Sequence, residues 1–390
     1  MPLRFYAGNE VELLESGAGY FPALIAAIDD AQREIHLQTY IFTRDATGAE
    51  VIRALVRAAQ RGVKVCVMVD GFGGRDFEQT IAPELLAAGA QVLIYRREAG
   101  GLKFRRHRLR RLHRKVTVVD RSLAFVGGIN IIDDLNNPTP MQPRFDYAVR
   151  VRGPVLAPIV VSTLRIWWLL AWASLKARPS WREIDPADFV RAGAVRAAFV
   201  VRDNLRNRRA IEEAYLDAIG GAREEILLAC AYFLPGRRFR TALERAAERG
   251  VKVTLLLQGR VEYRILHYAT RALYERLLEK GVRIFEYQAS FLHAKVGVID
   301  GDWATVGSSN IDPFSLLLSR EANLVVRDQA FAARLRQSLQ AAMQVDAREL
   351  LHADWLRSSR WERWISALAY GFLRRAMGLL GLDRRDVGTQ

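Results

Sequence analysis

The protein has 390 residues, enough for two or three domains with large hydrophobic cores. Half of the residues are hydrophobic and 26% are charged, which excludes an intrinsically disordered chain, a collagen-like chain and a multi-span membrane protein. The 58 basic residues exceed the 43 acidic ones and give a net charge of +15, which favours an anionic partner: nucleic acid, an anionic membrane or a phosphorylated substrate.

The first half of the chain predicts alternating helices and strands. Residues 21–31 have the apolar spacing of an amphipathic helix and lead into an extended apolar stretch that ends at residue 42. The segments 54–71 and 85–97 each predict a helix that stops near a glycine and is followed by a short apolar strand. Residues 112–130 predict two strands joined by a tight turn. Continuous apolar stretches of this length are typical of strands covered on both faces.

The second half of the chain repeats this pattern. The matching pairs of segments are 31–42 with 221–234, 61–71 with 249–259, 85–97 with 277–289 and 112–130 with 292–310. We therefore predict an α/β fold of two duplicated αβα sandwich domains with mixed β-sheets, over residues 1–175 and 199–345. Residues 176–198 contain two prolines and are predicted to link the copies, and residues 346–390 are predicted to form a C-terminal helical segment.

The first copy carries 12 extra residues, since 18 positions separate Tyr95 from His113 but only 6 separate Tyr287 from His293. The extra residues lie within 98–111. This basic insertion contains Lys103, Arg105, Arg106, Arg108, Arg110 and Arg111. It is either a solvated charged face or, this close to the motif described below, a lip that binds phosphate groups or lipid headgroups.

Residues 155–175 are almost entirely apolar, and Arg165 is their only charged residue. Because an arginine in the middle of a bilayer would be costly, we expect a helix packed partly on the protein. Its tryptophans Trp167, Trp168 and Trp172 would then face a membrane interface. A fully buried core helix and a true membrane span are the alternatives.

Two features bear on the compartment. Cys66 and Cys230 lie in stretches that predict buried strands, without the spacing of a metal site or a disulfide framework. The first ten residues lack the apolar core of a secretory signal. We expect the protein to work in a reducing compartment.

Both copies end in the same pattern of reactive residues: His-x-Lys-x-x-x-x-Asp, then a pair of small residues and an asparagine. The chain has only 6 His and 7 Lys, so two such motifs at one offset are not a chance event. The first motif contains His113, Lys115, Asp120, Gly127, Gly128 and Asn130, and the second contains His293, Lys295, Asp300, Gly307, Ser308 and Asn310.

The spacing predicts one pooled site. In a strand, residues two apart point to the same face, so each histidine and its lysine point together. Two copies packed about a pseudo-twofold axis would bring the two motifs face to face. Asn130 and Asn310 would add amide donors, and Gly128 and Ser308 are small enough to let a substrate approach the backbone.

These groups fit a phosphodiester substrate, and we expect neither a metal nor a cofactor. The lysines and asparagines would stabilise charge on the phosphate oxygens, while one imidazole attacks phosphorus and the other protonates the leaving oxygen. A nucleophilic imidazole is usually held neutral, in one tautomer, by a carboxylate at its other nitrogen. Asp146 and Glu321, each just before a short apolar strand, are the candidates for this role.

The paired motif resembles the signature of the phospholipase D superfamily. Within it, the chain is most similar to bacterial cardiolipin synthases of the shorter B-type, through YFLPGRRF at 232–239, QG at 258–259, FEY at 285–287 and VGSSNIDPFSLLLSREAN at 306–323. The resemblance covers nearly the whole chain and implies an active site at the interface of the two domains. It also implies His113 as nucleophile, His293 as general acid, and Asp120 and Asp300 as structural members of the motif.

The same resemblance implies a phosphatidyltransferase that makes cardiolipin from phosphatidylglycerol through a covalent phosphatidyl-histidine intermediate and releases glycerol. The implied partners are anionic phospholipids and the membrane surface, and not nucleic acid. Larger relatives carry two N-terminal transmembrane helices that are not found here, so we expect peripheral binding to the cytoplasmic face of the cell membrane. The oligomeric state stays open.

Residues 361–382 predict an amphipathic helix. One face carries Trp361, Trp364, Ile365, Leu368, Phe372 and Leu373, and Arg360, Arg363, Arg374 and Arg375 lie elsewhere. Such a helix suits an anionic membrane interface, and the alternative is a helix docked on the protein core.

Three rival functions remain. In a hydrolase of the same superfamily, water would resolve the histidine intermediate and release phosphatidic acid. A nuclease of the superfamily would account for the positive charge, although the Trp-rich segments have no obvious use on DNA. A membrane-tethering module with an inactive site is disfavoured by the two intact motifs.

Overall fold

The computed structural model describes residues 3–96, 110–135, 142–173, 185–204, 206–357 and 359–379. The elements of the first half are β1 (Tyr6–Glu15), α1 (Ser16–Asp29), β2 (Glu34–Thr39), α2 (Ala46–Gln60), β3 (Lys64–Asp70), α3 (Phe77–Thr80), α4 (Ala82–Ala87), β4 (Gln91–Tyr95), β5 (Lys115–Val119), β6 (Leu123–Gly127), β7 (Tyr147–Arg152) and α5 (Leu156–Ala173). Those of the second half are β8 (Val195–Arg202), α6 (Ala210–Gly221), β9 (Glu225–Cys230), α7 (Arg237–Glu248), β10 (Lys252–Gln258), α8 (Arg264–Arg271), α9 (Tyr274–Glu279), β11 (Arg283–Tyr287), β12 (Lys295–Ile299), β13 (Trp303–Gly307), α10 (Pro313–Leu317), β14 (Glu321–Arg327), α11 (Gln329–Val345), β15 (Ala347–Leu350), α12 (His352–Arg357) and α13 (Arg360–Leu379).

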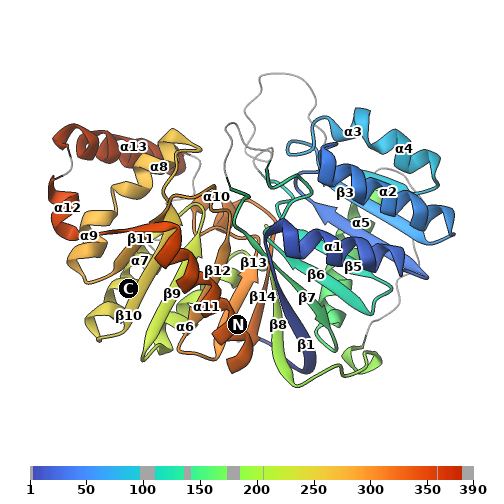
Figure 1. The fold of residues 1–390 in the computed structure, drawn as a ribbon, viewed down its shortest axis with the longest axis horizontal. Coiled ribbons are helices and arrows are strands. Elements are labelled where there is room, and N and C mark those ends of the chain that lie inside the picture. The colour runs from blue at the N-terminus through green and yellow to red at the C-terminus, as the bar shows by residue number, and fades with distance from the viewer. Residues whose placement is uncertain are drawn as a thin grey trace.

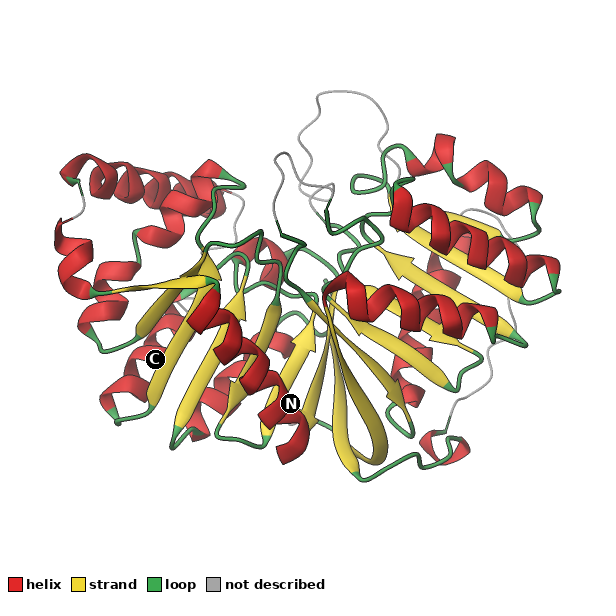
Figure 2. Cartoon of the chain, viewed as in Figure 1, coloured by secondary structure: helices red, strands yellow, loops and turns green. Residues whose placement is uncertain are grey.

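The strands form one mixed sheet with helices on both faces (Figure 2). The order β1-β7-β6-β5-β2-β3-β4 in the first half recurs as β8-β14-β13-β12-β9-β10-β11 in the second, with β15 added at the edge. β1 and β8 pair antiparallel at the centre, where Tyr6 lies opposite Ala197 and Asn9 opposite Val195. A pseudo-twofold axis between β1 and β8 produces this order, so the duplicated α/β fold is confirmed. The two sheets are nevertheless continuous rather than separate.

The apolar strands are covered on both faces, as predicted from their continuous hydrophobic sequences. In β3, Val65, Val67 and Val69 pack in the core formed with α1 and α2. The intervening Cys66 and Met68 pack instead against α5, on the opposite face. The alternation follows from the two-residue period of a strand, which sends successive side chains to opposite faces of the sheet. Figure 1 shows α1 and α2 in front of this half of the sheet and α5 behind it.

The structure differs from the sequence prediction at the junction of the two copies. β1 was not predicted, because its ten residues mix apolar and charged side chains without a clean period. β8 begins at Val195, inside the stretch predicted as a linker up to residue 198. A short 3-10 helix at Pro186–Asp188 precedes it. Residues 176–184 of that stretch, and residues 98–109 of the basic insertion, lie outside the described residues.

The apolar segment 155–175 forms α5, but its tryptophans do not share one environment. Trp167 is buried with Cys66, Met68 and Ile166, so the expectation that it faces a membrane is wrong. It covers the back of β3 together with Ile166 and Ala171 of α5 and with Leu112. Trp172, five residues further along α5, is 58% exposed. Across the described ranges, we find no helix with the length and hydropathy needed to cross a bilayer.

The amphipathic C-terminal helix is α13, which packs against α8 at the upper left of Figure 1. Leu373 is buried in the core of the second half, which corrects its expected place on the exposed face. The remaining apolar face points to solvent, with Trp361, Trp364, Leu368 and Phe372 all more than half exposed. The two indole rings stack with their centroids 5.0 Å apart. Docking on the core and exposure of an apolar face therefore coexist in one helix.

Candidate active site

The two motif histidines lie in corresponding places, directly before β5 and β12. Lys115 and Lys295 begin these strands, and both are almost fully buried. The Lys115 ammonium donates to the His113 carbonyl at 2.8 Å, and Lys295 donates to the His293 carbonyl in the same way. The i, i+2 spacing thus keeps each ammonium group within reach of its own histidine segment.

Backbone hydrogen bonds tie each histidine segment to the other half of the chain. The His113 N–H donates to the Arg320 carbonyl at 3.0 Å, and the Arg320 N–H donates back to Arg111 at 2.7 Å. The His293 N–H likewise donates to the Phe145 carbonyl at 2.8 Å. Since Arg320 and Phe145 immediately precede Glu321 and Asp146, these short bridges bring each predicted acid beside a histidine.

The pairing of acids and imidazoles crosses between the halves. His113 Nδ1 lies 3.0 and 3.1 Å from the two carboxylate oxygens of Glu321. His293 Nδ1 lies 2.6 Å from Asp146 Oδ2. A carboxylate at Nδ1 favours the tautomer with its proton there, which leaves the Nε2 lone pair available for chemistry.

Burial dominates the electrostatics of the site. It lowers the pKa of both His113 and His293, and the charges of the neighbouring lysines lower it further. Burial also lowers the pKa of Lys115 to about 7, and raises that of Asp146 to about 6. Two buried ammonium groups side by side create a place for an anion, because an anion stabilises both charged forms.

The small residues after each hairpin have other contacts than predicted. A Cβ on Gly128 would lie 2.4 Å from Asp146 Oδ1, so this glycine makes room for the acid rather than for a substrate. Ser308 is fully buried, and its hydroxyl donates to Glu321 Oε2 at 2.5 Å. Asn130 accepts the Ile41 N–H through Oδ1 at 3.1 Å, which leaves its Nδ2 as the group able to donate to a phosphate. Asn310 is buried in the corresponding place of the second copy.

The motif aspartates lie at the hairpin turns, at the far ends of β5 and β12 from the histidines. Asp120 accepts the backbone N–H groups of Gln32, Arg33 and Glu34 at 2.7–2.9 Å. Asp300 accepts those of Arg223, Glu224 and Glu225 in the same way. Both aspartates have positive φ, 50° and 53°, as a tight hairpin turn requires. These contacts fasten each hairpin to the start of the neighbouring strand.

Sequence reasoning missed three contacts around the histidines. Asp70 Oδ2 accepts the Leu112 N–H at 2.8 Å, and Gln258 Oε1 accepts the Leu292 N–H at 3.1 Å. Asp70 and Gln258 are the last residues of the equivalent parallel strands β3 and β10, and a glycine follows each of them. A polar residue before a glycine, repeated in both copies, was therefore the sequence signal that could have identified them. Tyr40 packs its ring edge-on against His113, with centroids 4.9 Å apart, and has no such repeat signal.

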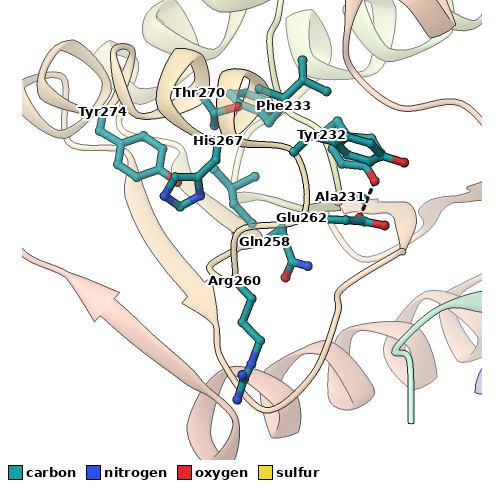
Figure 3. A pocket seen from close by; sticks show the side chains of 12 residues that line it. Ala231, Tyr232, Phe233, Gln258, Arg260, Glu262, His267, Thr270 and Tyr274 are labelled. Atoms are coloured by element: carbon teal, nitrogen blue, oxygen red, sulfur yellow. Dashed lines mark hydrogen bonds between the residues drawn. The ribbon is translucent and has the colours of Figure 1, made fainter. Parts of the chain in front are cut away.

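A small pocket lies beside the His293 segment (Figure 3). On one side Tyr232 donates its hydroxyl to Glu262 at 2.5 Å, and His267 and Tyr274 lie on the other side. Gln258 lies between them, and its Nε2 is buried with no hydrogen-bond partner among the described residues. The pocket thus offers both an acceptor and a donor to small hydroxyl groups. Within the same described ranges, no three His, Cys, Asp or Glu side chains cluster as a metal site would.

Comparisons with known proteins identify the family of this chain. The family described as "Cardiolipin synthase, PLD-like domain" matches residues 24–137 and 215–343, one match in each copy. Cardiolipin synthase B of Salmonella typhi is 40% identical over 378 residues, covering 96% of this chain and 90% of that protein. Cardiolipin synthase B of Escherichia coli (strain K12) is 39% identical over 375 residues, with the same coverage.

Among solved structures, the phosphatidylserine synthase of Haemophilus influenzae Rd KW20 has the same fold. Its TM-score is 0.72 over 98% of this chain and 97% of that chain, at 15% sequence identity. The duplicated sheet is therefore shared far beyond the range of close sequence similarity. The family match and the identity over nearly the full length together show that the chain belongs to the cardiolipin synthase family of phospholipase D-like enzymes.

Proposed function

We propose that the protein forms cardiolipin from two phosphatidylglycerol molecules by two successive displacements at phosphorus. The observation that carries this proposal is the pair of crossed dyads, His113 with Glu321 and His293 with Asp146, beside two buried lysines. One dyad can hold a covalent intermediate while the other moves protons, as a double displacement requires. Membership of the cardiolipin synthase family supports the choice of substrate.

In the first displacement, Nε2 of His113 attacks phosphorus and the bond from phosphorus to the glycerol headgroup oxygen breaks. Protonated His293 donates its proton to that oxygen, and glycerol leaves. Although burial lowers the pKa of His293, the phosphodiester anion favours its protonated form. Lys115 and Lys295 stabilise the charge on the phosphate oxygens. The assignment of His113 as nucleophile follows the family resemblance.

In the second displacement, a primary hydroxyl of another phosphatidylglycerol gives its proton to His293 and attacks phosphorus. The bond between phosphorus and His113 breaks, and cardiolipin forms. The pocket of Tyr232, Gln258 and Glu262 lies beside His293 and would hold the other, secondary hydroxyl group of the acceptor's headgroup. Because one phosphodiester replaces another, the step needs no nucleotide.

Membrane contact is part of the proposal. The exposed apolar face of α13 continues onto the start of α8, where Tyr263 and Ile265 are 57% and 50% exposed. Exposed arginines, among them Arg264, Arg374 and Arg375, accompany this face. An apolar face with flanking cations suits an anionic bilayer surface. We place the enzyme on the cytoplasmic face of the membrane as a peripheral protein.

The test is incubation of purified protein with phosphatidylglycerol vesicles, with and without EDTA, followed by lipid analysis. We expect cardiolipin and glycerol in equal amounts, at the same initial rate with and without the chelator. His113→Ala and His293→Ala should each abolish turnover, and the double variant should lose little more, because residues that act as a unit are not additive. Phosphatidic acid as the main product would instead establish the hydrolase, and cleavage of DNA the nuclease.

A further inference from the structure

A second cationic site lies next to the candidate active site. A cavity of about 250 Å³ opens between α5 and the loop after β8, and reaches Glu321. Its apolar lining comes from Pro158, Val161, Ile166 and Leu169 of α5 and from Val201 of β8. Its charged lining consists of five arginines, Arg114, Arg165, Arg202, Arg206 and Arg320, and two acidic residues, Asp203 and Glu321. The charged lining is therefore mainly cationic.

The cavity shares Glu321 with the candidate active site, but neither His113 nor His293 lines it. Glu321 bonds to Nδ1 of His113, whereas the proposed chemistry uses Nε2 at the other side of the ring. Arg114 and its partner Gln38 also have no counterpart in the second copy. The residue equivalent to Arg114 is Ala294, which also lies between the motif histidine and lysine. The residue equivalent to Gln38 is Ala229, because Gln38 pairs with Val116 in the first copy and Ala229 pairs with the matching Val296 in the second. The second motif lacks Arg114 and Gln38, so the catalytic role that the two motifs share does not require these two residues.

Arg114 is a buried cation whose hydrogen-bond partners, within the described part of the chain, are all neutral groups. It is 1% exposed, and it donates to Gln38 Oε1 at 2.9 Å and to Ser162 Oγ at 2.7 Å. Among the described residues no carboxylate lies within ion-pair distance of it. Burial and the charge of Arg320 lower the pKa of Arg114 to about 9. A buried charge without a counter-charge is costly, and an anion in the cavity would offset that cost.

We propose that this cavity binds the phosphate of an anionic phospholipid, as a second headgroup site apart from the reaction centre. Arg165 and Arg206 lie exposed at its mouth, and Arg114 and Arg202 lie at its buried end. The apolar residues of α5 continue outward through Leu169 and Trp172, which are 49% and 58% exposed. Free phosphate would contact only the arginines, whereas a phospholipid would contact the arginines and these apolar residues. The site extends the proposed function without depending on it.

The experiment measures binding of dihexanoyl-phosphatidylglycerol, below its micellar concentration, by titration calorimetry. The protein carries His293→Ala to block turnover, so that the measurement holds whether or not cardiolipin is the true product. We expect two molecules bound per chain. Arg165→Gln with Arg206→Gln should weaken one of the two sites by about tenfold or more and leave the other unchanged.

The matched control is Arg53→Gln with Arg334→Gln, which removes the same charge from two exposed arginines elsewhere. It should change neither site. Thermal unfolding of the Arg165/Arg206 variant should match that of its parent, because both side chains are exposed. Inorganic phosphate should bind the cavity at least about tenfold more weakly than the lipid. A single site per chain, equal weakening by the control, or equal affinity for inorganic phosphate would each overturn the proposal.

Discussion

Each imidazole at the centre of this protein is held by an acid from the opposite half of the chain. His113 contacts Glu321, and His293 contacts Asp146. The two acids differ in length by one methylene, and among the described residues Glu321 but not Asp146 accepts a hydrogen bond from a buried serine hydroxyl, that of Ser308. The two dyads are thus related by the repeat without being identical, as two different roles in one reaction would require.

Glu321→Gln tests the role of the acid at His113. The amide keeps the shape of the side chain but no longer favours the tautomer with a free lone pair at Nε2. We expect kcat to fall by roughly one to three decades with the thermal unfolding temperature little changed. The control is Glu50→Gln, an exposed glutamate on α2. A wild-type rate for Glu321→Gln would remove this acid from the site.

The pKa of Lys115 predicts a pH dependence of substrate binding. Its ammonium has a pKa near 7 in the free site, lowered by burial, and a phosphodiester binds only the protonated form well. Above pH 7 the Lys115 amine is mostly neutral, so it must take up a proton when the phosphodiester binds. The value of kcat/KM should therefore fall between pH 7 and 9, by up to about tenfold per pH unit.

Lys115→Arg checks this explanation, because a guanidinium stays protonated over that range. Whatever its absolute rate, the variant should lose the decline above pH 7. Lys64→Arg, an exchange at an exposed lysine of β3, should keep it. An alkaline decline of the same slope in Lys115→Arg would assign the titration to another group.

Among the elements, α13 shows best how a helix can serve two partners. Its Leu373 side completes the core of the second half, while Trp361, Trp364, Leu368 and Phe372 face solvent. Exposed large apolar side chains gathered on one helix indicate an interaction surface rather than a folding requirement. The helix lies at the same edge of the molecule as α3 and α8, toward which the parallel strands point (Figure 1).

Trp361→Ser with Trp364→Ser should weaken binding to phosphatidylglycerol vesicles at both low and high salt, because burial of apolar area is not screened by ions. Co-sedimentation at two ionic strengths measures this. Leu86→Ser with Val345→Ser replaces two exposed apolar residues on α4 and α11 and should leave binding unchanged. A loss confined to low salt would show that charge, and not the tryptophan pair, recruits the protein.

The pocket beside His293 is proposed to bind the acceptor lipid, and this can be tested through Glu262. Glu262 accepts the Tyr232 hydroxyl and, among the described residues, is the one carboxylate that lines this pocket. If it holds the secondary hydroxyl group of the acceptor's headgroup, Glu262→Gln should shift the products from cardiolipin toward phosphatidic acid, since water then competes better for the intermediate. The ratio of the two lipids is the measurement, with Glu213→Gln on α6 as the control. An unchanged ratio would place the acceptor elsewhere.

Across the whole molecule, the two copies are joined by the pair β1 and β8, so neither half has a sheet of its own with a free inner edge. Asn9 of β1 stabilises this junction between β1 and β8. It is fully buried, its Nδ2 donates to the carbonyls of Tyr6 and Val195, and its Oδ1 accepts the Val155 N–H at 2.8 Å. The two halves should therefore unfold together.

Asn9→Ala should lower the free energy of unfolding by roughly 2 kcal/mol or more, because it leaves buried backbone groups without partners. Calorimetry should show one transition for the wild type and for the variant, at a lower temperature in the variant. Gln60→Ala, at an exposed position on α2, is the control. Two separate transitions in the wild type would mean that this junction does not couple the halves.

The amino-acid sequence was sufficient for the parts of this protein that repeat. The duplicated α/β pattern, the two motifs and the candidate acids could all be read from the chain, because strand and helix periods and residue spacing are local properties. Local patterns did not predict β1, and they placed the start of β8 inside the linker. These two strands mix apolar and charged residues, and each is stabilised by pairing with the other.

The relations between the halves depended on tertiary structure. No local pattern shows that His113 contacts Glu321 and His293 contacts Asp146, that Ser308 binds an acid, or that Gly128 makes room for one. The same holds for Trp167, which is apolar enough for a membrane and is buried behind β3 instead. Such contacts join residues far apart in the chain, and their partners are set by how the two copies pack about their axis rather than by the sequence around either residue.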